Sequence, residues 1–453
     1  MLLAKTFMPL FGPLGWISIM LLLGVILRAK IKLFQTLLFP ASLIGGVIGF
    51  IVISAGGVNV SHDTFTVIAL HLFTIGFISI GLTGTDSKNG DGASRKVIFR
   101  GAIWMALIFI MCANIQSITG IGILYGLNQV MDPIWEGVGA LVGVGFTQGP
   151  GQAVNLAAVW ESSYKIPDAV SIGLTFAAVG FFIAAAFGVP LANWGLKKGI
   201  ATHASGNIPD DFRVGIALKD EGIVAGKQTT HAANIDTFAF QLAIILAIYF
   251  VTFIEAGYIT DLFPKVFKPM GYGLTFFWGM LNAIIVRLIL AKFKIVFTID
   301  NNVQRRITGT TVDFMIVATM MAVQIGIIWH YIIPISLICT VAAAFTFLIA
   351  TYFGKRNGGY PLERTLAMLG YCTGTAATGL LLLRIVDPEF KSPVAMEMGL
   401  MNIFCLFFGL HLSFVGYPLP DFGAFTGLLV HAGTFVVMLF FLKIFKFWNK
   451  PAW

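Results

Sequence analysis

Charged residues are scarce in this chain. Only 11% of its 453 residues are aspartate, glutamate, lysine or arginine, whereas 57% are hydrophobic. A soluble domain carries roughly 25% charged and 45–50% apolar residues, so this composition excludes a soluble globular protein. Lipid offers no water to pair backbone groups, so only helices and closed barrels span a bilayer. The apolar runs are about twenty residues long and lack the alternation of barrel strands, which predicts an all-α polytopic membrane protein.

Cysteine is also rare, and motifs of catalysis are absent. The four cysteines show neither disulfide pairing nor metal-ligand spacing. The chain has no His-Glu-x-x-His, Gly-x-Ser-x-Gly or Walker A motif, so an enzyme and an ATP-driven pump are unsupported. No cofactor is expected, and an ion gradient must supply the energy for any transport. The net charge of +8 comes from cations in short loops between apolar runs, which favours a bilayer over nucleic acid as the partner.

Apolar runs dominate what the sequence does contain. Hydropathy predicts eleven membrane spans, at residues 9–27, 37–55, 65–83, 101–125, 169–196, 236–257, 271–291, 311–328, 331–353, 394–416 and 423–442.

Two further apolar segments, at about 137–160 and 365–386, are interrupted by glycine and polar residues. The first contains Gln148-Gly-Pro-Gly151 and the second Cys372-Thr-Gly-Thr375. From Gln148 to Gly374 is 226 residues, and half of 453 is 226.5. A pair of broken segments at matching places in two halves points to the binding site of a secondary transporter. The alternative is that these glycines only permit tight helix packing.

The distribution of lysines and arginines indicates how the broken segments enter the membrane. If the N-terminus lies outside and both segments re-enter on their own side, 23 of the 29 lysines and arginines fall on the inner side and four on the outer side. This split obeys the positive-inside rule. We therefore predict two re-entrant hairpins, an outside N-terminus and a cytoplasmic C-terminus.

The same topology predicts an inverted repeat with hairpins entering from opposite faces. Residues 1–196 form the first repeat of five spans and a hairpin, and residues 236–416 form the second. Residues 197–235 are a cytoplasmic connector with a turn or helix start at Pro209-Asp-Asp211. Residues 417–453 hold an extra C-terminal helix.

The hairpins supply the candidate substrate and ion site. Their glycines and proline prevent a continuous helix, freed carbonyls can replace the water of a sodium ion, and half-helix N-termini attract carboxylates. The candidate residues are Thr147, Gln148, Gly149, Pro150, Gly151, Gln152, Asn155, Thr373, Gly374, Thr375 and Thr378.

Asp313 is a further candidate. It lies in the predicted first turn of an apolar span, where an intramembrane carboxylate suggests ion or proton coupling. The alternative is an interfacial carboxylate that meets the helix dipole. Arg287 and Arg384 can either pair a substrate carboxylate or extend to the interface. For Asn114 and Gln116, hydrogen bonds between helices are expected.

The chain resembles the bacterial glutamate:sodium symporter family over roughly residues 15–410. The resemblance rests on an ordered series of motifs: Phe39–Gly46, Phe73–Phe77, Gln116–Gly122, Met131–Ile134, Gly149–Gly151, Phe187–Ala192, Gly206–Asp211 and Gly370–Cys372. It implies sodium-coupled uptake of L-glutamate, with sodium as the coupling ion, an inner-membrane location, and a homodimer that works by an elevator-like shift. The first hairpin departs from the family's Gly-Gly-x-Gly, because Gln148 replaces the first glycine. The second hairpin, at Cys372-Thr-Gly-Thr375, is altered too, and the eleventh span is an addition to the family's usual ten.

Three other functions are alternatives to symport. A cation/proton antiporter is the main one and would use Asp313 as its proton site. An ion channel would need a continuous polar pore, whereas the sequence predicts half-entrances from opposite faces, and the sequence lacks the nucleophile with a base, or the metal set, of an intramembrane enzyme. Among acidic substrates, the sequence does not choose between glutamate, aspartate and dicarboxylates.

Overall fold

The computed structural model describes residues 11–83, 95–203, 213–216, 226–231, 233–268, 272–388 and 391–453. All regular secondary structure within these residues is helical. Eight helices are long and apolar enough to cross a membrane: α2 (Gly12–Lys30), α5 (His62–Leu82), α6 (Arg95–Leu127), α8 (Ala169–Lys197), α10 (Thr237–Leu262), α12 (Thr275–Lys292), α15 (Ile332–Gly354) and α20 (Ala424–Ile444). The chain is therefore a multi-pass membrane protein, as its composition predicts.

The other three predicted spans correspond to helices of a different character. The span at 37–55 is the short apolar α4 (Ala41–Ser54), which begins directly after Pro40, where proline is well tolerated at a helix start. The span at 394–416 is α18 (Val394–Gly416). The span at 311–328 is α13 (Asn301–Ala322), and its predicted bounds are wrong at both ends.

The start of α13 explains this error. The Asp300 carboxylate accepts a hydrogen bond from the Val303 amide at 2.9 Å, which is an N-cap interaction. The first turns that follow carry asparagines and arginines, so hydropathy does not register them as part of a span. The helix ends at Ala322, and a separate short helix, α14 (Ile325–His330), follows.

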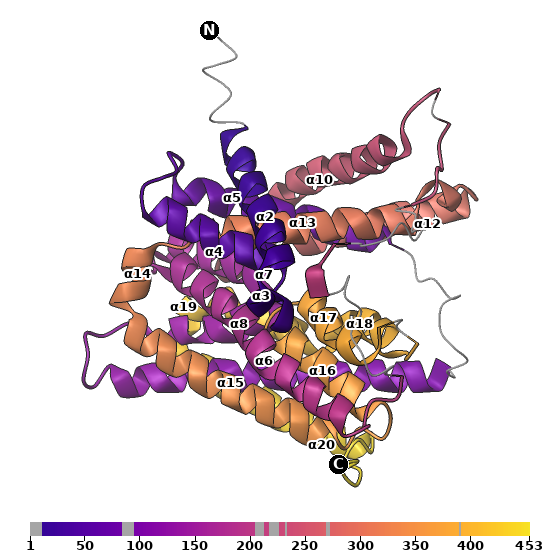
Figure 1. Cartoon of the computed structure of the whole chain (residues 1–453). Helices are drawn as coiled ribbons and strands as arrows, with labels where there is room; N and C mark the ends of the chain where they lie inside the picture. Colours follow the sequence, from indigo (N-terminus) through magenta and orange to yellow (C-terminus); the bar gives the residue numbers. More distant parts are fainter. Residues whose placement is uncertain are drawn as a thin grey trace. The chain divides into compact units, whose positions relative to one another are not determined.

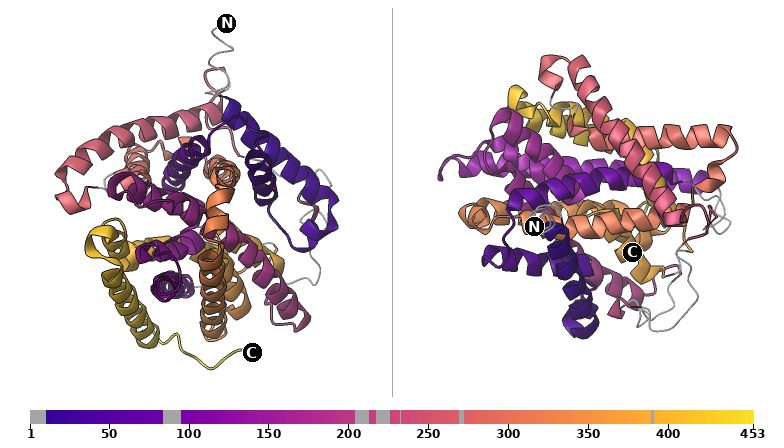
Figure 2. Two further views of the ribbon diagram at one scale, coloured as in Figure 1. Left: turned by 90° about the vertical axis from the view of Figure 1, so that its left-hand side faces the viewer. Right: turned by 90° about the horizontal axis from the view of Figure 1, so that it is seen from above.

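The described helices group into two compact units. Unit 1 comprises Met1–Leu27, Pro40–Ser87 and Gly215–Ala322, and unit 2 comprises Arg28–Phe39, Lys88–Val214 and Val323–Trp453. Each unit takes helices from both halves of the sequence. In the colours of Figures 1 and 2, unit 1 thus joins indigo helices such as α4 to pink and salmon ones such as α10 and α12, and unit 2 joins purple and magenta helices such as α6 and α8 to orange and yellow ones such as α15 and α20.

Unit 1 is built around α5, which packs on α12 and α13. Glycine allows the closest approach to α12, because a Cβ on Gly81 would lie 2.6 Å from the Met280 carbonyl oxygen. A buried polar chain crosses to α13 and α10: Ser79 donates to Gln304 Oε1 at 2.8 Å, and Gln304 donates to Gln241 Oε1 at 2.8 Å. Such bonds replace the water that is missing inside the membrane.

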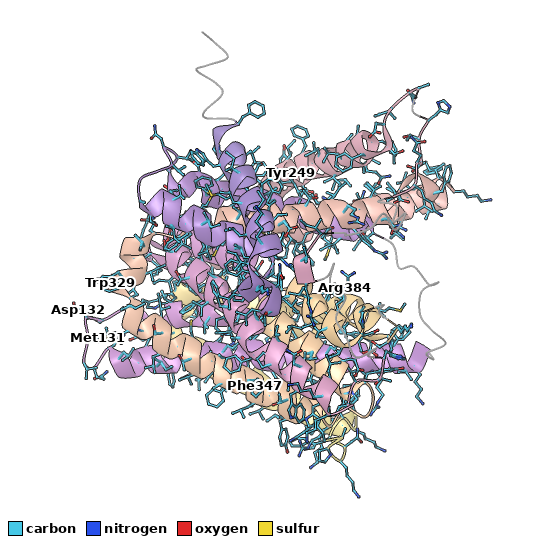
Figure 3. All side chains as sticks on the ribbon, in the orientation of Figure 1. Met131, Asp132, Tyr249, Trp329, Phe347 and Arg384 are labelled. Carbon is cyan, nitrogen blue, oxygen red and sulfur yellow. The ribbon has the colours of Figure 1, made fainter. Side chains whose placement is uncertain are left out.

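Unit 2 is built around α6, which packs on α7 (Leu141–Tyr164), α15, α18 and α20. Its central turns, around Trp104 and Met111, are fully buried. Near its end Gly120 meets Gly139 of the 3-10 helix η1 (Glu136–Ala140), and a Cβ on Gly120 would lie 1.9 Å from the Gly139 carbonyl oxygen. On α8, Phe187 packs against Phe347 of α15, with ring centroids 5.5 Å apart; Phe347 is labelled in Figure 3.

Part of the predicted connector at 197–235 is described, but its turn at Pro209-Asp-Asp211 lies outside the described residues. At its end, Asp236 caps α10 by accepting hydrogen bonds from the amides of Phe238 and Ala239 at 2.8 and 3.1 Å. The start of this helix therefore agrees with the predicted span.

Candidate functional site

The first broken segment is α7, and its break is at Gly149. This residue has φ 75° and ψ −171°, a backbone conformation that is essentially restricted to glycine. Pro150 then starts the second arm of α7. Proline suits this position because an N–H at the start of a helix has no partner within the helix. The break ends one helical arm and begins another, so carbonyls of the first arm and amides of the second are released from intrahelical bonds.

The second broken segment consists of α16 (Pro361–Cys372) and α17 (Ala376–Val386), separated by Thr373, Gly374 and Thr375. Thr375 has extended backbone angles, φ −148° and ψ 176°. Two glycines let the arms pack closely: a Cβ on Gly370 would lie 2.7 Å from the Thr378 carbonyl oxygen, and one on Gly379 would lie 2.6 Å from the Ala367 carbonyl oxygen. The arms lie next to each other in Figure 1.

The two breaks meet in unit 2. A Cβ on Gly149 would lie 2.5 Å from Thr375 Cγ2 and 3.2 Å from the Gly374 carbonyl oxygen. Real Cβ atoms essentially never lie as close as 2.5 Å to another atom, and other residues are strained at φ 75°, so glycine is strongly favoured at this crossing. Residues separated by half the sequence thus form one junction, in which two interrupted helices face each other.

Two full-length helices line the junction. On α8, a Cβ on Gly180 would lie 2.5 Å from the Thr373 carbonyl oxygen and 3.2 Å from Phe146 of α7, so Gly180 touches both broken segments. On α6, the Gln116 side-chain amide donates to the Cys372 carbonyl at 2.9 Å and to Thr346 Oγ1 of α15 at 2.7 Å. The bonds between helices expected for Gln116 are thereby confirmed.

The hydroxyls predicted to bind substrate are mostly engaged with their own helices. Thr147 donates to the Gly143 carbonyl at 2.6 Å and Thr373 to the Leu369 carbonyl at 2.7 Å, which leaves their oxygen lone pairs as acceptors. Thr375 and Thr378 share a hydroxyl contact at 3.5 Å.

The predicted amides of the first segment lie in three different environments. Gln152 is buried and donates to the Tyr417 hydroxyl at 3.4 Å, whereas its Oε1 has no partner among the described residues. Asn155 is half-buried, and Gln148 is exposed beside the break. Pro150 and Gly151 are buried.

Asp313 is not near a helix start, and that prediction is wrong. It lies in the middle of α13 in unit 1 and is exposed. The error follows from the polar first turns of α13, which hydropathy left outside the span. Asp313 is therefore too far from the N-terminus of α13 to interact with the helix dipole, which excludes this alternative interpretation.

The remaining polar candidates are placed as follows. Asn114 pairs with His431 of α20 at 2.7 Å, which is the expected bond between helices. Arg287 donates to the Leu82 carbonyl and to Asn301 Oδ1, both in unit 1. Arg384 is exposed in the last turn of α17 and is labelled in Figure 3.

Sequence reasoning missed a buried ion pair at the base of the second broken segment. Arg364 directly precedes the predicted broken segment at about 365–386, but it lies in the first turn of α16 and is 4% exposed. Its Nη2 and Nε contact the two carboxylate oxygens of Glu397 at 2.6 and 2.8 Å. Gly101 of α6 makes room for Glu397, since a Cβ there would lie 2.1 Å from the carboxylate carbon. Glu397, a carboxylate within the span predicted at 394–416, was the signal that could have found the pair.

The residues placed at the junction are neutral. The described residues hold no cluster of three His, Cys, Asp or Glu side chains that could bind a metal. Instead, the breaks offer carbonyl oxygens and neutral side chains. Unwound carbonyls can coordinate an alkali cation, and half-helix N-termini can face an anionic group.

The sequence model of the family described as "Sodium/glutamate symporter" matches residues 13–380. The chain belongs to the sodium/glutamate symporter family. This is a family of transporters, so the chain is not an enzyme. It is also similar to a protein of Haemophilus influenzae named "Sodium/glutamate symporter", with 23% identity over 395 residues, which is 84% of this chain and 89% of that protein. The family match ends within α17 and includes both breaks.

Proposed function

We propose that this chain carries out sodium-coupled symport of L-glutamate, or of a related acidic amino acid or carboxylate, across the inner membrane. The observation that carries the proposal is the contact of Gly149 with Gly374 and Thr375, which joins two interrupted helices from the two halves of the sequence. Paired broken helices are a means by which transporters bind ions and substrates away from bulk water. Family membership supports sodium as the coupling ion and glutamate as the substrate.

We propose that residues 1–196 and 236–416 form an inverted repeat. Unit 1 contains the first three predicted spans of both halves, and unit 2 contains the fourth span, the broken segment and the fifth span of both halves. Corresponding elements thus fall into the same unit, as a repeat with internal pseudosymmetry requires. An elevator-like mechanism needs one body that carries the whole substrate site, and unit 2 contains both breaks.

The junction residues have distinct proposed roles. Carbonyl oxygens released at Gly149 and Gly374 would replace part of the sodium hydration shell, and the arm that starts at Pro150 would direct its free amides at the substrate carboxylate. Thr147, Gln148, Gln152, Asn155, Thr373, Thr375 and Thr378 would supply the hydroxyl and amide contacts.

Asp313 supports a second candidate function. An exposed carboxylate in the middle of α13 is suited to bind a cation or to carry a proton. In the symporter it would contribute to coupling, and in a cation/proton antiporter it would be the proton site.

The remaining parts of the proposal concern topology and assembly. The positive-inside distribution supports an outside N-terminus, a cytoplasmic connector at 197–235 and a cytoplasmic C-terminus. We also propose that each broken segment enters and leaves the membrane on the same side. The protein is further proposed to assemble as a homodimer.

Counterflow in liposomes tests the proposed function. Vesicles containing the purified protein are loaded with unlabelled glutamate, and entry of labelled glutamate is measured in sodium, potassium or choline chloride, with aspartate, dicarboxylates and glutamine as competitors. We expect exchange only in sodium and competition only by acidic compounds. Equal exchange in choline would contradict sodium coupling, proton–cation exchange would identify an antiporter, and ohmic single-channel currents would identify a channel.

A further inference from the structure

Gln116 lies where the middle of α6 meets the end of the second broken helix. Its side chain is fully buried, and its amide nitrogen donates to Cys372 O at 2.9 Å and Thr346 Oγ1 at 2.7 Å. Its amide oxygen, Oε1, is buried as well and has no hydrogen-bond partner among the residues that the structure describes. A buried polar atom in this state calls for an explanation, and an ion or a water molecule at the oxygen is one.

The orientation of the amide is fixed by its two neighbours. The Cys372 carbonyl can only accept a hydrogen bond. The Thr346 hydroxyl donates its own proton to the Ala342 carbonyl at 2.7 Å, so it also acts as an acceptor toward Gln116. Both neighbours require the NH₂ group, and rotating the amide would place its oxygen against two other oxygens. The oxygen must therefore point away from them.

The surroundings favour a cation over an anion at this oxygen. Cys372 is the last residue of α16, and a helix C-terminus carries a partial negative charge. The break that follows also releases backbone carbonyls from their intrahelical bonds. Amide and backbone carbonyl oxygens are the neutral ligands that hard cations prefer.

We propose that Gln116 Oε1 is a direct ligand of the transported sodium ion, at a position where α6 meets the Cys372–Thr373 end of the second broken segment. The proposal rests on the proposed sodium symport and assigns to the ion site a residue outside both breaks. On the next residue of α6, Ser117 Oγ donates to the Ala140 carbonyl at 3.2 Å, directly before α7. One turn of α6 therefore touches the segments that carry both breaks, so an ion held by Gln116 would also fix their positions.

The test is sodium-dependent thermal stabilisation of the purified full-length protein, titrated with sodium chloride against choline chloride at constant ionic strength. Gln116→Leu removes the oxygen at similar volume, and Gln116→Asn withdraws it by one methylene. Thr346→Val is the matched control, since it removes a partner of the NH₂ group and leaves the oxygen in place. Loss of a ligand should raise the half-maximal sodium concentration about tenfold or more in both Gln116 variants, and Thr346→Val should change it much less.

Uptake measurements separate the ion site from the substrate site. At saturating sodium, Gln116→Asn should keep a glutamate concentration for half-maximal uptake close to that of the wild type. If Gln116→Leu does not fold, Gln116→Asn alone decides the outcome. A sodium midpoint unchanged in Gln116→Asn, with a normal wild-type response, would overturn the ligand assignment and indicate that a water molecule satisfies the oxygen. A wild-type protein without any sodium response would overturn the proposed function as well.

Discussion

Gly149 faces Gly374 across the junction of two broken helices, and a Cβ on Gly149 would lie only 3.2 Å from the Gly374 carbonyl oxygen. The two residues lie 225 positions apart in the sequence. At this distance a side chain added at Gly149 would press on the second break. We therefore expect a substitution in one break to affect the other.

Gly149→Ala should abolish uptake while the protein remains in the membrane. The added methyl group would meet Thr375 Cγ2, and alanine is strained at φ 75°. Gly122→Ala is the matched control, because it lies within α6 and a Cβ there meets nothing within 4 Å. Uptake and membrane yield of both variants are measured together. Normal uptake by Gly149→Ala would leave the glycines as packing residues only.

Gly180→Ala tests the contact of α8 with the second break. Its methyl group would press on the Thr373 carbonyl, for which the Cβ distance is 2.5 Å, so we expect impaired uptake at a normal expression level. Gly173→Ala on the same helix should be tolerated, since its nearest atom would be 3.5 Å away. Equal effects of the two substitutions on initial uptake rates would refute a specific role of Gly180.

Asp313→Asn should change the sodium dependence of uptake more than the yield of folded protein. The side chain is exposed in the middle of α13, so replacing its carboxylate by an amide of similar size removes the charge without opening a cavity. Asp63→Asn serves as the control, because Asp63 is an exposed carboxylate in the first turn of α5. Uptake is titrated with sodium at constant ionic strength. An unaltered sodium midpoint with normal transport would make Asp313 a structural residue.

Arg364→Met should destabilise the protein by about 3–5 kcal/mol, because it leaves the Glu397 carboxylate buried without its counter-charge. The double variant Arg364→Met/Glu397→Leu should recover much of this loss, since neither charge is then buried. Thermal unfolding in detergent measures Arg364→Met, Glu397→Leu and the double variant. A double variant whose loss of stability equals the sum of the losses of the two single variants would show that the pair does not act as a unit.

The sequence predicts the positions of the breaks because their signals are local. Gly149 followed by Pro150 cannot continue a helix, and Gly374 between two threonines interrupts the second segment in the same way. The long apolar helices follow from composition for a similar reason. Whether the breaks would meet could not be read from either motif alone, since the contact depends on packing between segments that are far apart in the chain.

Other parts of the site depend on such packing as well. Gln116 could face any neighbour of α6, and only the structure shows that it bonds the Cys372 carbonyl. Arg364 directly precedes the segment predicted at about 365–386, so hydropathy leaves it outside, whereas in the structure it lies in α16 and pairs with Glu397. The position of Asp313 was predicted wrongly because the first turns of α13 are polar, and hydropathy detects apolar runs rather than helices.

Accumulation of glutamate driven by a sodium gradient tests the central claim most directly. Liposomes containing the purified protein receive an inward sodium gradient, and the membrane potential is set with potassium and valinomycin. We expect uptake above equilibrium that requires the sodium gradient and becomes faster when the interior is negative, because each net positive charge carried inward gains about 2.3 kcal/mol per 100 mV. Glutamine should compete poorly. Uptake that a proton gradient drives equally well in the absence of sodium, or that prefers glutamine, would contradict the account.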